Sequence, residues 1–206
     1  MSDSVVVIGA GGHAKVVLAT LEALEIEVSG IFDDNSDLWG MQLLGVEIKG
    51  PIEEAQNHGT SGVLALGANR DRQSMANQLS LDWKSAVHPS AQVHTSVELG
   101  SGTVIFAGAI VQPETVIGDH VIVNTGARID HDCRIRSFSH IAPGASLAGA
   151  VSIGEGVLMG IGSCAGPGVT VGEWSVVGAG AAVVGDLAPG VTATGVPARV
   201  FGGDRS

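Results

Sequence analysis

The stretch LGSGTVIFAGAIVQPETVIGDHVIV, residues 99–123, places a large aliphatic residue at every sixth position. The frame runs without a slip from residue 93 to residue 183, and fifteen of its sixteen positions carry a large aliphatic side chain. A six-residue unit of this form is the hexapeptide repeat, which winds into a parallel β-helix of triangular section with three units in each coil. The sixteen positions, which we expect to point into the axis of the prism, are Val93, Leu99, Ile105, Val111, Ile117, Val123, Ile129, Ile135, Ile141, Leu147, Ile153, Met159, Ala165, Val171, Val177 and Val183.

The residue four places after each aliphatic supports the same interpretation. It is small or β-branched, as at Ala109, Thr115 and Val121, in every unit except the last, where it is Leu187. A β-sandwich with alternating strands is the main alternative, but it would not keep a six-residue frame over so many units. Seventeen units from Val87 to Ala188 therefore predict a β-helix of between five and six coils.

The first part of the chain has a different pattern. Residues 5–32 read as strand, glycine turn, helix and strand, because the β-branched run VVVIG is followed by GAGGH and by apolar residues at helical spacing. A third strand is expected over residues 63–70, followed by a polar, helix-prone segment to about residue 82. Such an arrangement is half of a doubly wound α/β fold, in which ligands lie at the carboxyl ends of the strands. The sequence thus predicts a Rossmann-like domain over residues 1–84 and a β-helix domain with a C-terminal tail over residues 85–206.

Composition excludes some partners. The 206 residues include 31 glycines and only 3% aromatics, so the core must be built from small and β-branched side chains. A formal net charge of −11, with ten Lys and Arg residues, argues against a nucleic-acid polymer as partner. The N-terminal stretch does not resemble a signal peptide, no apolar run is long enough to span a membrane, and two cysteines are too few for a disulfide scaffold. We therefore expect a cytoplasmic protein that is not inserted in a membrane.

Two histidines lie nine residues apart in RIDHDCRIRSFSH, residues 128–140. Three six-residue units make an 18-residue coil, so Pro113, His131, Gly149 and Pro167 should stack in one column. Because His131 follows the inward Ile129 by two positions, its side chain should point outward. It is then either a solvated surface histidine or a functional one at a subunit contact.

The surroundings of His131 favour a functional interpretation. Asp130 and Asp132 could fix the tautomer of the ring and raise its basicity, as suits a general base. The unscreened N–H of Gly149, one coil along, could stabilise an oxyanion. A flat-sided prism with small outward residues packs naturally against copies of itself, which would bring His140 of one chain near His131 of another. A base, a second polar side chain and a bare amide are what acyl transfer from a thioester requires.

In these residues and in the segments quoted below, the chain resembles the PglD/NeuD family of bacterial sugar acetyltransferases. Members of that family are trimeric left-handed β-helix enzymes that use acetyl-CoA. The resemblance covers nearly the whole chain. The segments that carry it are VVVIGAGGHAKVV at 5–17, IFDD at 31–34, LGANR at 66–70, VNTGARIDHDCRI at 123–135, SHIAPGASLAG at 139–149 and GVPAR at 195–199.

The resemblance implies roles for individual residues. It makes His131 the general base and Asp132 its support, while Asn124 and His140 position the acetyl donor and the Gly149 amide donates to the oxyanion. No metal is required. The positions implied for coenzyme A lie in the last coils and the tail: Gly160, Ile161, Gly178, Ala179, Gly195, Val196, Pro197 and Arg199. Those implied for the nucleotide sugar lie in the first domain: Gly9, Gly11, Gly12 and His13 along the phosphates at a helix N-terminus, Asp33 and Asp34 on the base or ribose, and Gly67, Asn69 and Arg70 closing the pocket.

The expected reaction is N-acetylation of a nucleotide-linked 4-amino-4,6-dideoxyhexose at subunit interfaces of a homotrimer. A UDP-linked acceptor is preferred because IFDD resembles the uridine-contacting form of the motif, GDP-perosamine comes next, and O-acetylation of sialic acid or another surface sugar is third. NAD binding by GAGGHA, a zinc-dependent trimeric β-helix carbonic anhydrase and a passive scaffold are more distant alternatives. Cys133 is expected in the core, and His88, His94 and His120 at the surface or at corners.

Overall fold

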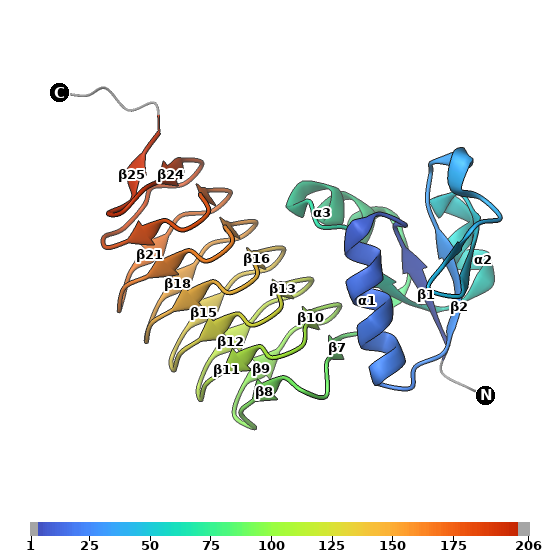
Figure 1. Ribbon diagram of the computed structural model, residues 1–206, viewed down its shortest axis with the longest axis horizontal. Coiled ribbons are helices and arrows are strands. Elements are labelled where there is room, and N and C mark those ends of the chain that lie inside the picture. The colour runs from blue at the N-terminus through green and yellow to red at the C-terminus, as the bar shows by residue number, and fades with distance from the viewer. Residues whose placement is uncertain (1–3, 202–206) are drawn as a thin grey trace.

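The computed structural model describes residues 4–201 and consists of an α/β domain joined to a triangular β-helix (Figure 1). The α/β domain lies at the N-terminal end of the prism, and the last coils lie at the opposite end. In Figure 1, helices α1 and α3 lie toward the prism, and α2 lies on the side away from it. The left-handed β-helix and the Rossmann-like domain that the sequence predicts are both confirmed.

The α/β domain contains a six-stranded sheet in the order β3-β4-β2-β1-β5-β6, parallel except for the β3–β4 pair. Its strands are β1 Val5–Ile8, β2 Val28–Phe32, β3 Gln42–Leu43, β4 Val46–Gly50, β5 Ser61–Leu64 and β6 Asp82–Trp83. Its helices are α1 Gly12–Ala23, α2 Ala55–His58 and α3 Asn69–Gln78, with short 3₁₀ turns η1 Ser36–Leu38 and η2 Ile52–Glu54.

Two expectations about this domain were wrong. The sheet has six strands rather than about three. The two-residue strands β3 and β6 are too brief to produce a readable alternation, but β4 does alternate apolar and charged residues in VEIK. The strand expected over residues 63–70 ends at Leu64, and α3 begins at Asn69. The carbonyls of Leu66 and Gly67 accept hydrogen bonds from the Arg72 side chain instead of joining the sheet.

The β-helix has three faces, each a parallel sheet of stacked short strands. The first face contains β7 Ala86–Val87, β10 Val104–Ile105, β13 Ile122–Val123, β16 His140–Ile141, β19 Leu158–Met159, β22 Val176–Val177 and β24 Thr192–Thr194, closed by antiparallel β25 Arg199–Val200. The second face contains β8 Gln92–Val93, β11 Ile110–Val111, β14 Arg128–Ile129, β17 Ser146–Leu147, β20 Cys164–Ala165 and β23 Ala182–Val183. The third face contains β9 Glu98–Leu99, β12 Val116–Ile117, β15 Arg134–Ile135, β18 Ser152–Ile153 and β21 Thr170–Val171.

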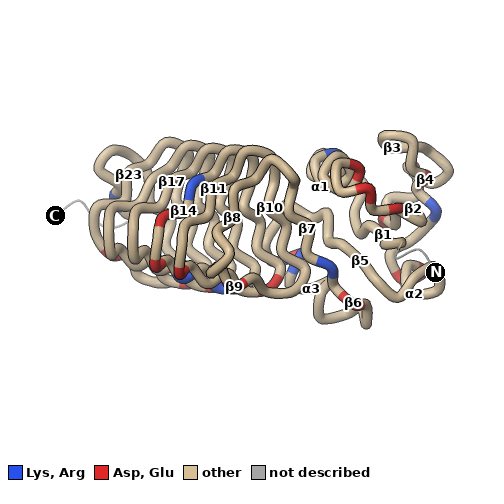
Figure 2. Tube along the Cα trace, turned by 90° about the horizontal axis from the view of Figure 1, so that it is seen from below, with Lys and Arg blue, Asp and Glu red and all other residues tan. Residues whose placement is uncertain are grey.

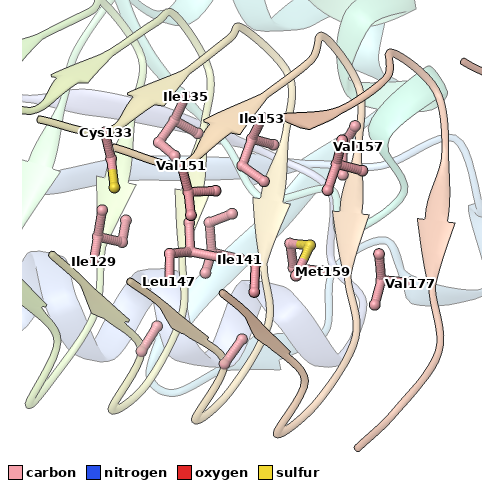
Figure 3. Close-up of a cluster of buried hydrophobic side chains, with 14 of the residues drawn as sticks. Ile129, Cys133, Ile135, Ile141, Leu147, Val151, Ile153, Val157, Met159 and Val177 are labelled. Atoms are coloured by element: carbon pink, nitrogen blue, oxygen red, sulfur yellow. The ribbon is translucent and has the colours of Figure 1, made fainter. Parts of the chain in front are cut away.

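The predicted six-residue frame forms the core of this prism. Strand pairing matches residues 18 apart, for example Ile105 with Val123 and Ile129 with Leu147, so each aliphatic stacks on another one coil away. Figure 3 shows these side chains filling the axis, together with Cys133 from the intervening small-residue positions. Cys133 is fully buried, as expected. Removing one such aliphatic side chain from water contributes about 1.5–3 kcal/mol, so repetition supplies the stability that aromatic residues provide elsewhere.

The two domains share a continuous apolar junction. Outward residues of the first coils, Val104, Phe106 and Ile122, are buried in one cluster with the apolar face of α1. His120 lies in the corner turn between β12 and β13, one of its two expected locations, but it is not a surface residue, because this corner is covered at the junction and the side chain is only 6% exposed. Its ring stacks on Phe138 at 5.3 Å and meets Trp83 edge-on at 5.4 Å.

Strand β6 ends at Trp83 and β7 begins at Ala86, so the chain passes from one domain to the other over these few residues. The expected ranges 1–84 and 85–206 include residues 1–3 and 202–206, which lie outside the described ones. Figure 2 shows few charged positions along the prism and no continuous basic stripe over its described coils. None of the helices over residues 4–201 has the length and apolarity needed to cross a membrane.

Candidate active site

His131 lies at the corner between the second and third faces, in the turn that joins β14 to β15. Its ring is exposed, and Nδ1 lies 2.7 Å from Oδ2 of Asp132. Asp130 caps the turn by accepting a hydrogen bond from the His131 backbone N–H at 2.8 Å. The hydrogen bond to Asp132, followed by the charge of Asp130, raises the pKa of His131 above its ordinary value of 6.5. When Nδ1 carries the proton shared with Asp132, Nε2 is free to act as a base.

Gly149 lies one coil along, directly against the His131 ring. A Cβ at this position would meet Cε1 at 2.6 Å and Nε2 at 2.7 Å, so only glycine fits the ring in this orientation. Within the described chain, the Gly149 N–H takes no part in the backbone hydrogen bonds that tie coils together, whereas the neighbouring Ala148 and Ala150 both donate. The His131 imidazole and the free Gly149 N–H of the described chain therefore lie side by side, as the 18-residue stacking predicts.

The glycine turn after β1 leads into α1. Gly9 has a φ of +102°, and a Cβ there would meet the Leu66 side chain at 2.7 Å. Gly11 and Gly12 face open space, and no side chain caps the first turn of α1. Uncapped N–H groups beside open space at a helix N-terminus are suited to a phosphate.

Asp33 and Asp34 follow β2 and are already engaged with the backbone. Asp33 accepts from Ala10 N–H at 2.7 Å and from Asn35 N–H, and Asp34 accepts from Ile52 N–H at 3.0 Å. Asp33 and Asp34 therefore hold the loops around the glycine turn in place, and their arrangement does not by itself identify which nucleobase would bind.

A cavity of about 730 Å³ opens at the domain junction between the glycine turn, the start of α3 and the first face of the prism. It is lined by His13, Gly67, Ala68, Asn69, Arg70, His140, Gly156, Leu158, Trp174 and Val176. Four of the predicted substrate-binding residues and His140 thus meet in one place. The Arg70 guanidinium stacks over the Trp174 ring at 4.3 Å and joins the two domains across the cavity. No sequence motif marks Trp174.

His140 faces this junction from β16. Asn124 Oδ1 accepts from Thr125 N–H at 2.8 Å, which fixes the amide so that Nδ2 donates to His140 Nε2 at 2.9 Å. The acceptor nitrogen must be unprotonated, so the His140 proton lies on Nδ1. Burial, the Arg72 charge and the nearby His13 lower the pKa of His140 to about 3, while a hydrogen bond with the Gly67 backbone opposes them. Burial and Arg72 also lower the pKa of His13 to about 4.

The residues implied for coenzyme A lie along one edge of the prism. Asn124, Gly160 and Gly178 each directly follow a strand of the first face. Whole 18-residue coils separate them, so they stack along the corner between the first and second faces. A Cβ at Gly160 would meet the Val177 carbonyl at 2.5 Å, and one at Gly178 would meet Thr194 at 2.8 Å. The other members of this set extend the edge toward the tail: Ile161, Ala179, Gly195, Val196, Pro197 and Arg199. Ile161 and Val196 are exposed, and the Arg199 guanidinium donates to the Ala198 carbonyl at 2.9 Å.

The two parts of the predicted site do not meet within one chain. His131 and His140 are nine residues apart, which is half of an 18-residue coil, so they lie on opposite sides of the prism. Among residues 4–201, no three His, Cys, Asp or Glu side chains gather in a way that could hold a metal ion.

Arg72 is the functional candidate that sequence reasoning missed. It is 1% exposed and donates to carbonyls of both domains. In the sequence it lies in the polar run NRDRQ, which is typical of a solvated helix, and no periodicity distinguishes it from Arg70.

Comparisons with known proteins agree with this arrangement. The PglD N-terminal domain model matches residues 4–79. The structure of PerB from Caulobacter crescentus in complex with CoA and GDP-perosamine is 41% identical, with a TM-score of 0.91 and coverage of 97% of each chain. The acetyltransferase domain of PglB from Neisseria gonorrhoeae in complex with acetyl coenzyme A is 36% identical, with a TM-score of 0.91 and coverage of 98% of this chain and 100% of that one.

WeeI from Acinetobacter baumannii is 23% identical with a TM-score of 0.87, covers 96% of this chain and 99% of its own, and supports the fold alone. The search of curated proteins gives no match. Identity of 41% over nearly the full length of both chains extends from the N-terminal domain through the whole prism, so it includes both parts of the site. The chain therefore belongs to the PglD-type family of bacterial sugar N-acetyltransferases and is an acetyl-CoA-dependent enzyme.

Proposed function

We propose that the protein transfers the acetyl group of acetyl-CoA to the amine of a nucleotide-linked 4-amino-4,6-dideoxyhexose, with His131 as the general base. The observation that carries this proposal is the 41% identity, over 97% of each chain, to an enzyme whose structure holds both CoA and GDP-perosamine. The side-by-side placement of the His131 ring and the Gly149 amide supports it from the geometry of the chain itself.

The proposed reaction uses groups already described. The neutral amine attacks the thioester carbonyl, and His131 Nε2 accepts a proton from the nitrogen as the C–N bond forms. The Gly149 N–H donates to the oxyanion of the tetrahedral intermediate. The intermediate collapses with cleavage of the C–S bond, and coenzyme A leaves as a thiolate that takes up a proton. Because a neutral amine is already a good nucleophile, positioning supplies most of the rate enhancement.

The acceptor binds across the domain junction in this proposal. Its phosphates lie at the uncapped start of α1, beside Gly11, Gly12 and His13, and its sugar extends into the cavity closed by Asn69 and Arg70. Acetyl-CoA lies along the edge that carries Asn124, Gly160, Ile161, Gly178 and Ala179. The small residues there let the pantetheine arm approach the backbone.

The complete site is shared between subunits. Since His131 and His140 lie on opposite sides of one prism, a neighbouring copy must bring its His131 corner to the His140 pocket. A closed homotrimer provides three such contacts with one repeated interface.

GDP is the first nucleotide to test. The IFDD pair is the sequence feature that favours UDP. The Asp33 and Asp34 carboxylates already accept backbone hydrogen bonds, however, and need not face a nucleobase. A GDP-linked amino sugar bound to the 41% identical relative favours GDP-perosamine over the UDP-linked form.

The test is a thiol-release assay with acetyl-CoA against GDP-linked and UDP-linked 4-amino-4,6-dideoxyhexoses, with mass detection of the acetylated product. The proposal expects turnover with at least one amino sugar, a mass increase of one acetyl group, and faster turnover of the GDP form. Turnover of a sialic acid hydroxyl in place of either amine would shift the assignment to O-acetylation. Analytical ultracentrifugation of the same sample tests the trimer.

A further inference from the structure

The buried Arg72 side chain connects three segments that meet at the domain junction. It donates through Nε to the His120 carbonyl at 2.8 Å, and through Nη1 to the Leu66 and Gly67 carbonyls at 3.0 and 3.2 Å. Through Nη2 it donates to Asn69 Oδ1 at 3.0 Å and to the Phe138 and Ser139 carbonyls at 2.7 and 3.2 Å.

These partners surround His140 closely. The Phe138 and Ser139 carbonyls belong to the two residues just before His140, and Gly67 hydrogen-bonds the His140 ring through its backbone. Asn69, whose Oδ1 accepts from Arg72, donates through Nδ2 to the Gly156 carbonyl at 2.9 Å and to the Val157 carbonyl at 3.2 Å on the next coil. One guanidinium thus sets the spacing between the cavity-lining loop and the strand that carries His140.

Hydrogen bonding between the two domains would not by itself require a charged side chain at position 72. No carboxylate within the described chain forms an ion pair with Arg72, so its charge is balanced only by carbonyl and amide oxygens. Burial lowers the pKa of Arg72 to about 9, which leaves it protonated at neutral pH. The charge acts on the histidines that face it, His13, His120 and His140, and disfavours protonation of each.

We propose that Arg72 is a positioning residue for acetyl transfer, which holds His140 with Nε2 turned to Asn124 and holds the Gly67 loop against the same ring. This inference rests on the proposed function, in which His140 and Asn124 position the acetyl donor. Arginine is needed because the planar fork of a guanidinium has five N–H groups, one of them shared between two oxygens, that together reach six oxygens on three segments. An ammonium has only three donors and cannot span them.

The test compares Arg72→Lys and Arg72→Gln with Gln73→Ala in the full chain. Gln73 is the next residue of α3 and also crosses the junction, where its Nε2 donates to Glu155 Oε1 at 2.8 Å, so it is a matched control outside the proposed machinery. Each variant is measured for kcat and for KM of both substrates. The ring nitrogens of His140 are observed by NMR in protein with ¹⁵N-labelled histidine, and assigned with His140→Gln.

We expect Arg72→Lys to fold, to lose about 100-fold in kcat/KM with a raised KM for acetyl-CoA, and to shift the His140 ring signals from a single Nδ1–H tautomer toward an average of two. Gln73→Ala should keep the kinetic constants and ring signals of the natural protein. The proposal is wrong if Arg72→Lys keeps its kcat/KM, if activity falls while both KM values and the ring signals stay unchanged, or if neither Arg72 variant folds. The NMR readout needs no turnover, so it separates failure of this inference from failure of the proposed function.

Discussion

His131 and His140 lie nine residues apart in the same β-helix, yet they differ in exposure and in the direction in which their pKa is shifted. His131 lies exposed at a corner beside two carboxylates, which raise its pKa. His140 lies half-buried on a face that the α/β domain covers, and burial with the Arg72 charge lowers its pKa to about 3. His131 lies in a corner turn and His140 in a strand that the α/β domain covers, and the residues around each histidine set its pKa.

The two histidines also differ in how far away in the sequence the residues around them lie. The environment of His131 arises from residues within one coil of it, whereas that of His140 depends on a second domain more than 60 residues away in the sequence. The first histidine should therefore be sensitive to changes in the repeat, and the second to changes at the domain junction.

The largest expected effect comes from removing the proposed base. His131→Ala should lower kcat by about 10²–10⁴-fold, the usual contribution of general-base catalysis. Because the ring is exposed and, within the described part of the chain, hydrogen-bonds only Asp132, the melting temperature should stay within about 2 °C of the natural value.

His94→Ala is the control for this variant. His94 is an exposed prism histidine whose side chain, among residues 4–201, hydrogen-bonds only Ser96, so its loss should leave kcat unchanged. Near-normal activity of His131→Ala, measured by thiol release under saturating substrates, would remove His131 from the catalytic role.

Gly149→Ala should displace the His131 ring without changing the histidine itself. The backbone at Gly149 does not require glycine, but the added Cβ would lie 2.6 Å from the His131 ring and force it to move. A displacement on the order of 1 Å costs about 100-fold in rate. Combining Gly149→Ala with His131→Ala should add little to the loss caused by His131→Ala alone, since the clash needs the ring.

Gly185→Ala provides the matched glycine control, because a Cβ there meets nothing within 4 Å. Full additivity of the two losses in kcat would show that Gly149 acts independently of the ring. The Gly149 amide would then be the part of the site that the variant disturbs.

The two regions also differ in how far sequence could predict them. The side-chain period of six predicted the prism, its inward residues, the outward His131 and its contact with Gly149, because all of these follow from the 18-residue coil. Arg72, the burial of His120 and the β3–β4 hairpin escaped prediction. Arg72 and His120 depend on contacts between the domains. In the hairpin only β3, with two residues, is too short to show a period, whereas β4 alternates apolar and charged residues over VEIK and could have been predicted.

Asp132→Asn should weaken the hydrogen bond that raises the pKa of His131 without removing the histidine. As a base, His131 must be neutral, so kcat/KM should rise with pH through its raised pKa. An amide supports the imidazolium less well than a carboxylate, so the acid limb of the profile should move to lower pH and the plateau should fall about tenfold. Asp130→Asn should shift the limb less, because Asp130 acts on the ring only through its charge. An acid limb that stays in place in Asp132→Asn would assign the titration to another group.

The smallest expected effect concerns stability at acid pH and depends on the buried histidines. Burial, with the Arg72 charge, lowers the pKa of His13 and His120 to about 4, although Asp119 opposes this at His120. Between pH 6.5 and about 4 the unfolded chain therefore binds protons that the folded chain does not, and stability must fall as the pH falls. The raised pKa of His131 acts in the opposite direction, but weakly, because that ring is exposed.

A series of melting temperatures from pH 7.5 to 4.5 measures this slope. His120→Phe should flatten it by a few degrees, because it keeps the stacking on Phe138 and removes both a titrating group and a buried Nδ1 that has no hydrogen-bond partner among residues 4–201. His94→Phe at an exposed position should leave the slope unchanged. If the melting temperature of the natural protein were constant over this range, the junction histidines would not be held neutral, and the contrast between His131 and His140 would be one of exposure alone.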